Sequence, residues 1–402
     1  MDRLLLYLRC LALACGLILA CQTQVHAQAQ PVLTLKVMLL VPADDARLQR
    51  SRLERAAPGH ASGPLADALK LALADHQAEL ESAGIGLQLQ ISAVADAQTA
   101  GQIATAAQAS GAVALLTDLP ELATLAVADA VKLPVLNLSQ GADSLRQAQC
   151  RRNLFHLSPS ERMKADALAQ FLMSRKWQQV LLLSGPSAED QLRSASAQAA
   201  IKRYGLKLVA SKAFKLSADP RERELANPLL LTGPSVGAHD VVWVVDSDAE
   251  FAMQLPFRTA LPRPVVGDAG LAALAWSPKF ERYGAPQVTR RLHKAVGRPM
   301  SAHDWPAWMA GKALVGAALA SAQAKPKGAS AAFNQALAEI ELDGSKGVLM
   351  NFRRWDRQLR QPMMLSDGHG VAALAPVEGV LHPKNNLDTL GADAPEKLCN
   401  PR

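Results

Sequence analysis

The chain has 402 residues and a formal charge of +7, and only 4% of its residues are aromatic. Its Lys and Arg residues are spread without a long basic block, which argues against a nucleic-acid-binding surface. The scarcity of aromatic side chains argues against a sugar-binding cleft built from stacking rings. After removal of an N-terminal signal, about 375 residues remain, enough for two domains of ~100–200 residues each.

The N-terminus has the three parts of an export signal, which we place at residues 1–27. Two arginines give a positive start, residues 11–20 are apolar, and residues 25–27 are typical of a cleavage site. The apolar segment is too short to span a membrane, which takes ~20 residues. The four residues that end at Cys21 also resemble a weak lipoprotein signal, so lipid attachment there is an alternative. In either case we expect a soluble protein exported to the periplasm.

The cysteines fall into two groups. Cys10, Cys15 and Cys21 lie in or beside the signal, so only Cys150 and Cys399 clearly survive processing. In an oxidising compartment, two thiols suggest one disulfide rather than a metal site. We therefore expect a bond between Cys150 and Cys399 that ties the end of the chain to the first domain.

From residue 33 onward, strand-like and helical patterns alternate with short connections. We expect strands at residues 33–41, 87–94, 112–116 and 134–138, and helices at residues 64–84, 97–110 and 120–131. Residues 43–63 are polar and basic without a clear period, so we expect a long surface loop there. The alternation is typical of a doubly wound parallel sheet.

A second unit of the same kind starts at residues 154–157. We expect strands at residues 180–184, 206–213, 241–245 and 264–266, and helices at residues 161–175 and 189–204. The strand 241–245 is an unbroken run of β-formers, which suits a strand buried on both faces. Beyond Trp276 we expect helices at 280–296, 304–323 and 331–341, then a hairpin around Asp367-Gly368. Trp305 and Trp308 are interpreted as core residues.

The last third of the chain carries the more specific motifs. They are Trp276, Arg282-Tyr283-Gly284-Ala285, Gly297-Arg298-Pro299-Met300, Asp304-Trp305, the run Phe352–Pro362 and Leu387–Gly391. With the two α/β units, the chain resembles a type I periplasmic binding protein, the fold of the branched-chain amino-acid binding proteins. The motifs resemble those of the subfamily associated with alcohol dehydrogenase systems that depend on pyrroloquinoline quinone (PQQ). The resemblance implies an α/β fold with two doubly wound parallel-sheet lobes joined by three crossover segments.

The resemblance also divides the chain. It places lobe 1 at residues 28–158 and 268–346, lobe 2 at residues 159–267 and 347–385, and a C-terminal tail at residues 386–402. It implies the substrate-binding component of an ABC-type importer, linked to PQQ-dependent alcohol oxidation, with an ABC permease in the inner membrane as partner. It implies no cofactor and no catalysis, and we find no nucleophile elbow, P-loop or zinc-ligand spacing. The alternative is a non-transport periplasmic accessory or sensor that binds a quinone cofactor, a metal ion or a dehydrogenase partner.

Candidate ligand contacts lie where strands end, because open α/β sheets bind ligands beyond the carboxyl ends of their strands. We expect contacts from Ser139 and the Gly141 backbone on one side of the ligand, and from Asp246 and Asp268 on the other. Asp268 is near the position of the family's amine-binding carboxylate, and we expect it on an exposed loop; a purely turn-forming role is equally open. Asp118 replaces the hydroxyl-rich turn that holds a ligand carboxylate in that family. We therefore expect a neutral polar or cationic solute rather than an amino acid.

Two charged segments allow more than one interpretation. The carboxylates Asp246, Asp248 and Glu250 would suit a hard cation such as calcium. Alternatively, Asp248 caps the following helix while Asp246 faces solvent, which is the interpretation that we favour. The arginines within Phe352–Pro362 are interpreted as a solvated face, with contact to a partner as the alternative.

Overall fold

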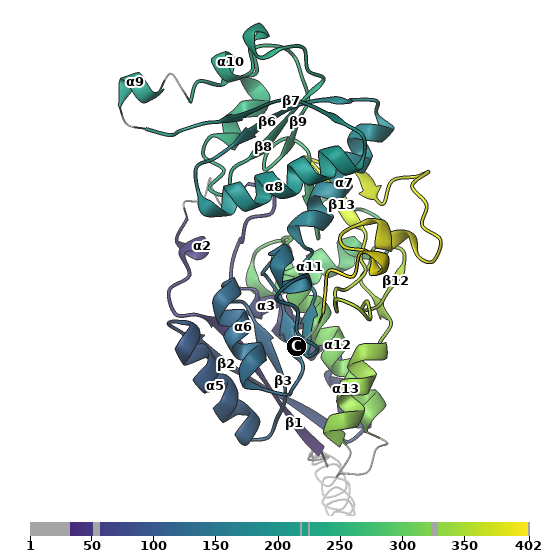
Figure 1. Cartoon of the computed structure of the whole chain (residues 1–402). Coiled ribbons are helices and arrows are strands. Elements are labelled where there is room, and N and C mark those ends of the chain that lie inside the picture. The colour runs from purple at the N-terminus through teal and green to yellow at the C-terminus, as the bar shows by residue number, and fades with distance from the viewer. Residues whose placement is uncertain (1–32, 51–56, 218, 224–225, 323–328, 401–402) are drawn as a thin grey trace, which may run out of the picture.

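The computed structural model describes residues 33–50, 57–217, 219–223, 226–322 and 329–400. The predicted signal at residues 1–27 and the alternative lipid-attachment site Cys21 lie outside the described residues. The described chain forms two α/β lobes, which lie one above the other in Figure 1. No helix in the described ranges is long and apolar enough to cross a membrane.

The first lobe is built on a five-stranded parallel sheet in the order β2-β1-β3-β4-β5. Its strands are β1 (Leu33–Pro42), β2 (Ile85–Val94), β3 (Ala112–Thr117), β4 (Val135–Asn137) and β5 (Leu154–His156). Successive side chains of β1 point to opposite faces. Leu35, Val37 and Leu39 therefore join one hydrophobic core, while Met38 and Leu40 join another. Helices have to cover both faces of such a sheet.

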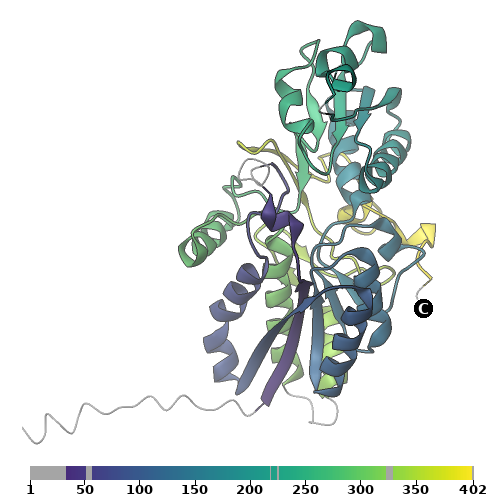
Figure 2. The same cartoon turned by 90° about the vertical axis from the view of Figure 1, so that its left-hand side faces the viewer.

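Two groups of helices provide this cover (Figure 1 and Figure 2). The helices of this lobe are α2 (Ala46–Gln49), α3 (Ala66–Asp75), α4 (Gln77–Ser82), α5 (Ala97–Ala109), α6 (Glu121–Ala130), η2 (Asp143–Arg146), α11 (Ala285–Val296), α12 (Trp305–Ser321) and α13 (Ala329–Glu339). Side chains of α5 and α6 join the core with Leu40, and those of α3, α11 and α12 join the core with Leu39. Trp305 and Trp308 are buried in the core that contains Leu39, as predicted.

Three predicted segments differ from the structure. The helix expected at residues 64–84 is divided into α3 and α4, because the backbone of His76 leaves the helical conformation with φ −112°. The loop expected at residues 43–63 contains the short helix α2, which Asp45 caps by accepting the N–H of Arg47; residues 51–56 of this loop lie outside the described residues. The helix expected from residue 280 begins only at Ala285, because Gly284 has a left-handed backbone.

The second lobe is built on a four-stranded parallel sheet in the order β7-β6-β8-β9. Its strands are β6 (Gln179–Ser184), β7 (Lys207–Ala213), β8 (Val241–Val245) and β9 (Val265–Gly267). All five residues of β8 are buried, as the unbroken apolar run predicted. Val241, Trp243 and Val245 face one core, and Val242 and Val244 face the other.

The remaining elements of this lobe are α7 (Glu161–Ser174), α8 (Ala188–Arg203), α9 (Pro220–Arg223), α10 (Pro228–Leu231), η3 (Pro234–Val236) and η4 (Ala252–Phe257). An antiparallel sheet of β10 (Ala272–Leu274), β13 (Met363–Ser366) and β14 (Val371–Ala375) contains the predicted hairpin. Met363 and Leu365 of β13 face the core of the second lobe, while Met364 faces the core of the first. This sheet therefore packs against both lobes. The short strands β11 (Leu342–Asp343) and β12 (Leu349–Met350) pair with each other.

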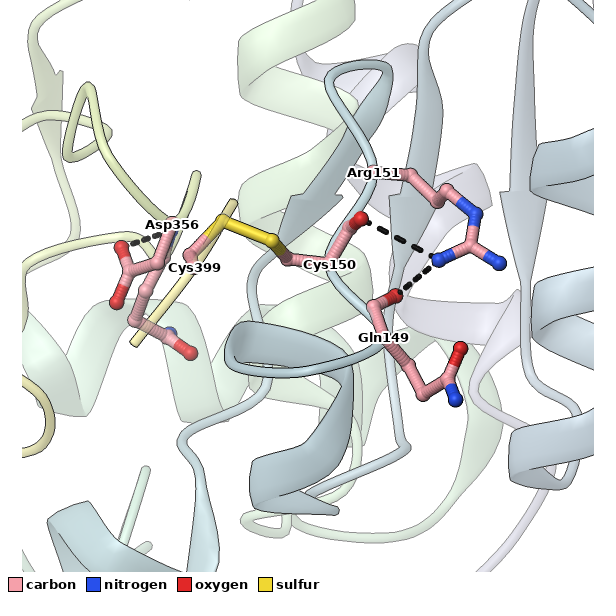
Figure 3. The surroundings of a disulfide bond; sticks show 6 residues. Gln149, Cys150, Arg151, Asp356 and Cys399 are labelled. Carbon is pink, nitrogen blue, oxygen red and sulfur yellow. Dashed lines mark hydrogen bonds between the residues drawn. A yellow bond between two sulfur atoms is a disulfide. The ribbon is translucent and has the colours of Figure 1, made fainter. Parts of the chain in front are cut away.

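The C-terminal segment is attached at two places. Cys150 and Cys399 form the predicted disulfide, with their Cα atoms 5.7 Å apart. Figure 3 shows this bond beside Gln149 and Arg151 on one side and Asp356 on the other. The short helices η6 (Asn386–Thr389) and η7 (Ala394–Glu396) precede Cys399.

The second attachment corrects the interpretation of the arginine run as a solvated face. Arg353 is fully buried. It donates hydrogen bonds to the carboxylate of Asp388 at 3.1 Å and to the carbonyl groups of Leu387 and Ala392 at 3.0 and 3.3 Å. Arg360 donates to the same carboxylate. Arg353 and Arg360 face inward because the C-terminal segment covers them and supplies their acceptors, whereas Arg354 is exposed, as a solvated face predicts.

Candidate functional site

Strand ends of the two lobes face each other across the molecule. Helix α2 lies between the lobes in Figure 1, and Arg50 follows it directly. Arg50 donates from Nη2 to the carbonyl oxygen of Ser247 at 3.3 Å, and the same nitrogen lies 3.7 Å from the Asp248 carboxylate. Ser247 and Asp248 follow β8 in the second lobe. The space between the lobes is therefore bordered by the carboxyl ends of strands from both sheets.

On the first lobe, an ion-paired cluster surrounds Asp118, which follows β3. Arg47 donates to both carboxylate oxygens of Asp118, at 2.8 and 2.9 Å, and also to Asp45. Burial favours a higher pKa for Asp118, but His303 and Arg47 outweigh burial and hold this pKa below its ordinary value. Burial also lowers the pKa of His303. Arg47, which donates to both oxygens of Asp118, is the stronger partner of this carboxylate. Asp118 is thus a neutralised carboxylate rather than the unpaired charge that the sequence suggested.

The turn after β4 lies beside this cluster. The side chain of Ser139 forms a hydrogen bond with Asp118. Gly141 lies against the start of α7, where its carbonyl oxygen accepts the N–H of Glu161 at 2.9 Å. A Cβ atom at Gly141 would be only 2.6 Å from a carboxylate oxygen of Glu161. A larger residue here would therefore require the Glu161 side chain to shift away from the turn.

On the second lobe, Asp268 is held on both sides. One of its oxygens is paired with Arg193 of α8, and the other accepts the N–H of Asp246 at 2.6 Å. Its side chain is 17% exposed, so the expectation of an exposed loop residue is wrong. Arg193 also donates to Glu161 at 3.1 Å. Burial acts to raise the pKa of Glu161, but Lys164 and Arg193 lower it to about 2.

Asp246 and Asp248 have the reverse of the roles that the sequence suggested. Asp246 is buried, and its Oδ2 accepts the N–H groups of Phe251 and Ala252 at 3.0 and 2.9 Å. The side chain of Asp248 is 78% exposed. The chain reverses at Ala249, which has a φ of 61°, and this brings the following N–H groups over Asp246. Burial, together with repulsion from nearby carboxylates, raises the pKa of Asp246 to about 6.

We predict that Asp246→Asn changes the pH dependence of stability. The folded protein holds a proton on Asp246 up to about pH 6, whereas the unfolded chain loses it near pH 4. The wild type therefore loses stability as the pH rises through this interval. An asparagine keeps the acceptor for Phe251 and Ala252 and does not ionise. When the pH is raised from 4 to 7, the free energy of unfolding of the variant should therefore increase by about 1–3 kcal/mol relative to that of the wild type.

Urea unfolding at both pH values measures this gain. The exposed Asp248→Asn is the matched control and should show no such gain. Asp166, whose pKa burial also raises to about 6, is present in every variant and cancels in the comparison. Equal pH profiles for Asp246→Asn and the wild type would contradict the prediction.

Comparisons with known proteins support a single fold assignment. A family model described as periplasmic binding protein matches residues 56–222. No curated protein sequence matches the chain. A solved ABC transporter solute-binding protein from R. palustris, in complex with benzoate, has a TM-score of 0.64 at 16% identity, covering 85% of this chain and 95% of its own.

Two further structures are similar. A periplasmic binding protein from Burkholderia mallei has a TM-score of 0.67 at 13% identity, covering 91% of this chain and 98% of its own. An ABC transporter substrate-binding protein from Desulfitobacterium hafniense, in complex with Leu, has a TM-score of 0.65 at 13% identity, covering 84% and 99%. The chain has the type I periplasmic binding protein fold. This fold consists of the two parallel-sheet lobes expected from the sequence.

Within this binding-protein fold, the four predicted site residues form two pairs. Ser139 and Gly141 share the turn after β4, and Asp246 and Asp268 are hydrogen-bonded to each other. A line of charged contacts connects the pairs, because Glu161 lies against Gly141 and bonds to Arg193, which is paired with Asp268. Contact of these four residues with a ligand stays a prediction.

Sequence reasoning missed three charged residues of the site: Arg47, Glu161 and Arg193. Arg47 follows Asp45 by two residues in a segment without a clear period, and only the fold brings it to Asp118, 71 residues later. Glu161 directly follows Ser160, the N-cap of α7, which is a recognisable start signal. Arg193 is one of many polar residues on α8, so no local signal sets it apart.

The structure also bears on the alternative of a cation site. Within the described ranges, no group of three or more His, Cys, Asp or Glu side chains is arranged to hold a metal ion. Oδ2 of Asp246 is used by two backbone N–H groups, and Asp268 is paired with Arg193. These carboxylate oxygens therefore already have protein donors, and a cation that binds Asp268 has to compete with Arg193.

Proposed function

We propose that the protein is the periplasmic solute-binding component of an ABC-type importer and binds a small solute between its lobes. The observation that carries this proposal is the pair of polar clusters at facing strand ends, one around Asp118 and one around Asp268. Ligands of open α/β proteins bind beyond the carboxyl ends of the strands and between domains. The solved proteins with the same fold include solute-binding proteins of ABC transporters, which supports binding without catalysis and an ABC permease as the partner.

The charges of the cleft favour a neutral polar or cationic solute, such as an alcohol-derived compound, an amine or a metal complex. The carboxylates of the two clusters are Asp45, Asp118, Glu161, Asp190, Asp246 and Asp268, and their cationic partners are Arg47, Lys164 and Arg193. Negative charge is therefore in excess among these residues. A ligand carboxylate would also have to compete with two protein carboxylates for Arg47. An amino acid is a poor ligand for such a site.

The proposed contacts are Ser139 and the Gly141 backbone on one side, and Asp246 and Asp268 on the other. In this proposal, lobe 1 comprises residues 28–158 and 268–346, and lobe 2 comprises residues 159–267 and 347–385. The link to PQQ-dependent alcohol oxidation is the finer part of the proposal and rests on the motifs of the last third. A thermal-shift screen with alcohols, their acids, amino acids, calcium, lanthanides and PQQ tests the ligand class. Stabilisation by PQQ or a metal ion alone would favour the accessory or sensor role.

Binding should close the lobes over the solute. Lobes joined by a few crossover segments close by rotation about those segments. Small-angle scattering should therefore show a smaller radius of gyration when the best solute of the screen is at saturation. Leucine, added at the same concentration, is the control and should leave the radius unchanged. The same radius with and without a saturating solute would count against closure.

We predict that Asp268→Asn weakens binding of a cationic solute by about 2–5 kcal/mol, because a charge pair in a closed, largely dry cleft is lost. Ser139→Ala should weaken binding by about 0.5–1.5 kcal/mol through one lost hydrogen bond. Asp268→Asn should also destabilise the protein, since Arg193 loses one of its two ion-pair partners and keeps only Glu161.

Calorimetry measures both affinities, and the exposed Glu250→Gln removes a nearby carboxylate as a control. Unaltered affinity in both Asp268→Asn and Ser139→Ala would remove these two residues from the site.

A further inference from the structure

A buried arginine lies beneath the turn after β4. Arg146, at the end of η2, is 2% exposed. Its Nη1 donates to the carbonyl oxygens of Gln140 and Ala142 at 2.9 and 3.0 Å, and these two residues flank Gly141. In a trans peptide the C=O and the next N–H point in opposite directions. With the Gln140 carbonyl directed at Arg146, the Gly141 N–H therefore points away from the guanidinium.

The same guanidinium reaches the segments that connect the lobes. Its Nη2 donates to the carbonyl oxygen of Ser158 at 2.8 Å, in the connection between β5 and α7. Its Nε donates to Oε1 of Gln358 at 2.8 Å, in the segment that leads toward β13. Gln358 in turn donates to the carbonyl oxygens of His156 and Ser158, both at 3.1 Å. One side chain thus joins the turn to two interlobe connections.

The four acceptors of Arg146 are all neutral oxygens, and within the described residues it forms no ion pair. Burying a cation without a counter-ion costs stability. Burial lowers the pKa of Arg146 to about 10, which still leaves it charged at neutral pH. A guanidinium spreads its donors over three nitrogens and can therefore reach acceptors that lie farther apart than those of a lysine, whose donors all lie on one nitrogen.

We propose that Arg146 is the positioning residue of the ligand-binding turn, and that Gln358 couples this turn to the connections between the lobes. Arg146 fixes the carbonyl groups of residues 140 and 142, so the Gly141 N–H keeps the direction in which it meets a ligand. Rotation of the lobes moves Ser158 and Gln358, and through Arg146 it moves the turn. The ligand part of this inference rests on the proposed function, whereas the positioning of the turn does not.

Hydrogen exchange of the ligand-free protein, followed by mass spectrometry, tests the positioning. Arg146→Lys keeps the charge but loses the fork, while the exposed Arg152→Lys is the matched control. In Arg146→Lys, the amides of Gln140 and Ala142 should exchange at least about tenfold faster, since more than one charged hydrogen bond is lost. Amides of the buried strand β3 should be unchanged, which a general loss of stability would not allow. Unchanged exchange in the turn would overturn the proposal.

Gln358→Asn gives a second measurement if Arg146→Lys does not fold. The shorter side chain withdraws its oxygen from Arg146, so turn exchange should again increase while β3 stays protected. An increase confined to residues 156–158 would show that Gln358 supports the connection without coupling it to the turn.

Calorimetry with ethanolamine, the smallest alcohol that carries an ammonium group, tests the consequence for binding. Arg146→Lys should weaken its binding about tenfold, and Arg152→Lys should not. If ethanolamine binds the wild type and Arg146→Lys equally, the turn is not positioned for the ligand and the proposal fails. If it does not bind the wild type, the proposed ligand class is called into question, while hydrogen exchange still decides the role of Arg146.

Discussion

Removal of the Cys150–Cys399 bond should lower the free energy of unfolding by about 2–5 kcal/mol. The two cysteines are 249 residues apart, so the bond closes a loop that contains most of the described chain. In the chain-entropy model, a loop of this length corresponds to about 5 kcal/mol as an upper value, because the cross-link restricts the unfolded chain. Denaturation of the double variant Cys150→Ser/Cys399→Ser, compared with the unreduced wild type, measures the effect.

Two controls make this result specific. Intact mass after alkylation without reduction should show that neither thiol of the exported wild type reacts. The wild type under reducing conditions should have the same stability as the double variant under the same conditions, since neither contains the bond. Two freely alkylated thiols in the exported protein would rule out the bond, and equal stability of the wild type and the variant without reductant would rule out its contribution.

The regular part of the fold could be predicted because local patterns determine it. Alternation of strands and helices, and the fully apolar run of β8, required a parallel sheet covered on both faces. The cysteine pair followed from counting, because only Cys150 and Cys399 lie outside the predicted signal. The break at His76 was not predictable in this way, since the apolar pattern continues across it from α3 into Leu80 of α4.

The site was only partly predictable, because its chemistry depends on pairs of residues that are distant in sequence. Strand ends identified Ser139, Asp246 and Asp268, but not their partners. Arg193 is 75 residues from Asp268, and it converts an expected free carboxylate into half of an ion pair. The sequence favours Asp248 as the cap of the following helix, because it is the nearer of the two carboxylates, and this leaves Asp246 facing solvent. The left-handed turn at Ala249 instead brings the N–H groups back over the earlier carboxylate.

For a related reason, the interpretation of the arginine run as a solvated face is wrong for Arg353, although it holds for Arg354. A charged segment is usually solvated, and only its context shows otherwise. Here the C-terminal segment covers the run, and carbonyl groups of Leu387 and Ala392 accept hydrogen bonds from Arg353. Trp355 also donates to the carbonyl of Ala392 at 3.1 Å. Arg353 in this run therefore attaches the C-terminal segment and does not form part of a solvated surface.

Arg353→Met should destabilise the protein by about 3–5 kcal/mol, because it leaves the buried carboxylate of Asp356 without its ion-pair partner. Arg353 and Asp388 are both buried, and the arginine also serves carbonyl groups that would lose their donor. Arg360 still pairs with Asp388, at 2.8 Å, so the carboxylate is not left without a cation. Methionine retains much of the apolar stem, so the loss reports the hydrogen bonds rather than a cavity.

The neighbouring Arg354→Met is the matched control, because Arg354 is exposed and its loss should change stability by less than about 0.5 kcal/mol. Urea unfolding of both variants measures the difference. Arg353 and the disulfide hold the same C-terminal segment, so their effects should not add. Once Cys399 is released, part of the segment is already free, and Arg353→Met should cost about 0.5–3 kcal/mol less than in the intact protein. Full additivity would show that the two attachments stabilise the fold independently, and equal effects of Arg353→Met and Arg354→Met would show that burial of Arg353 contributes nothing.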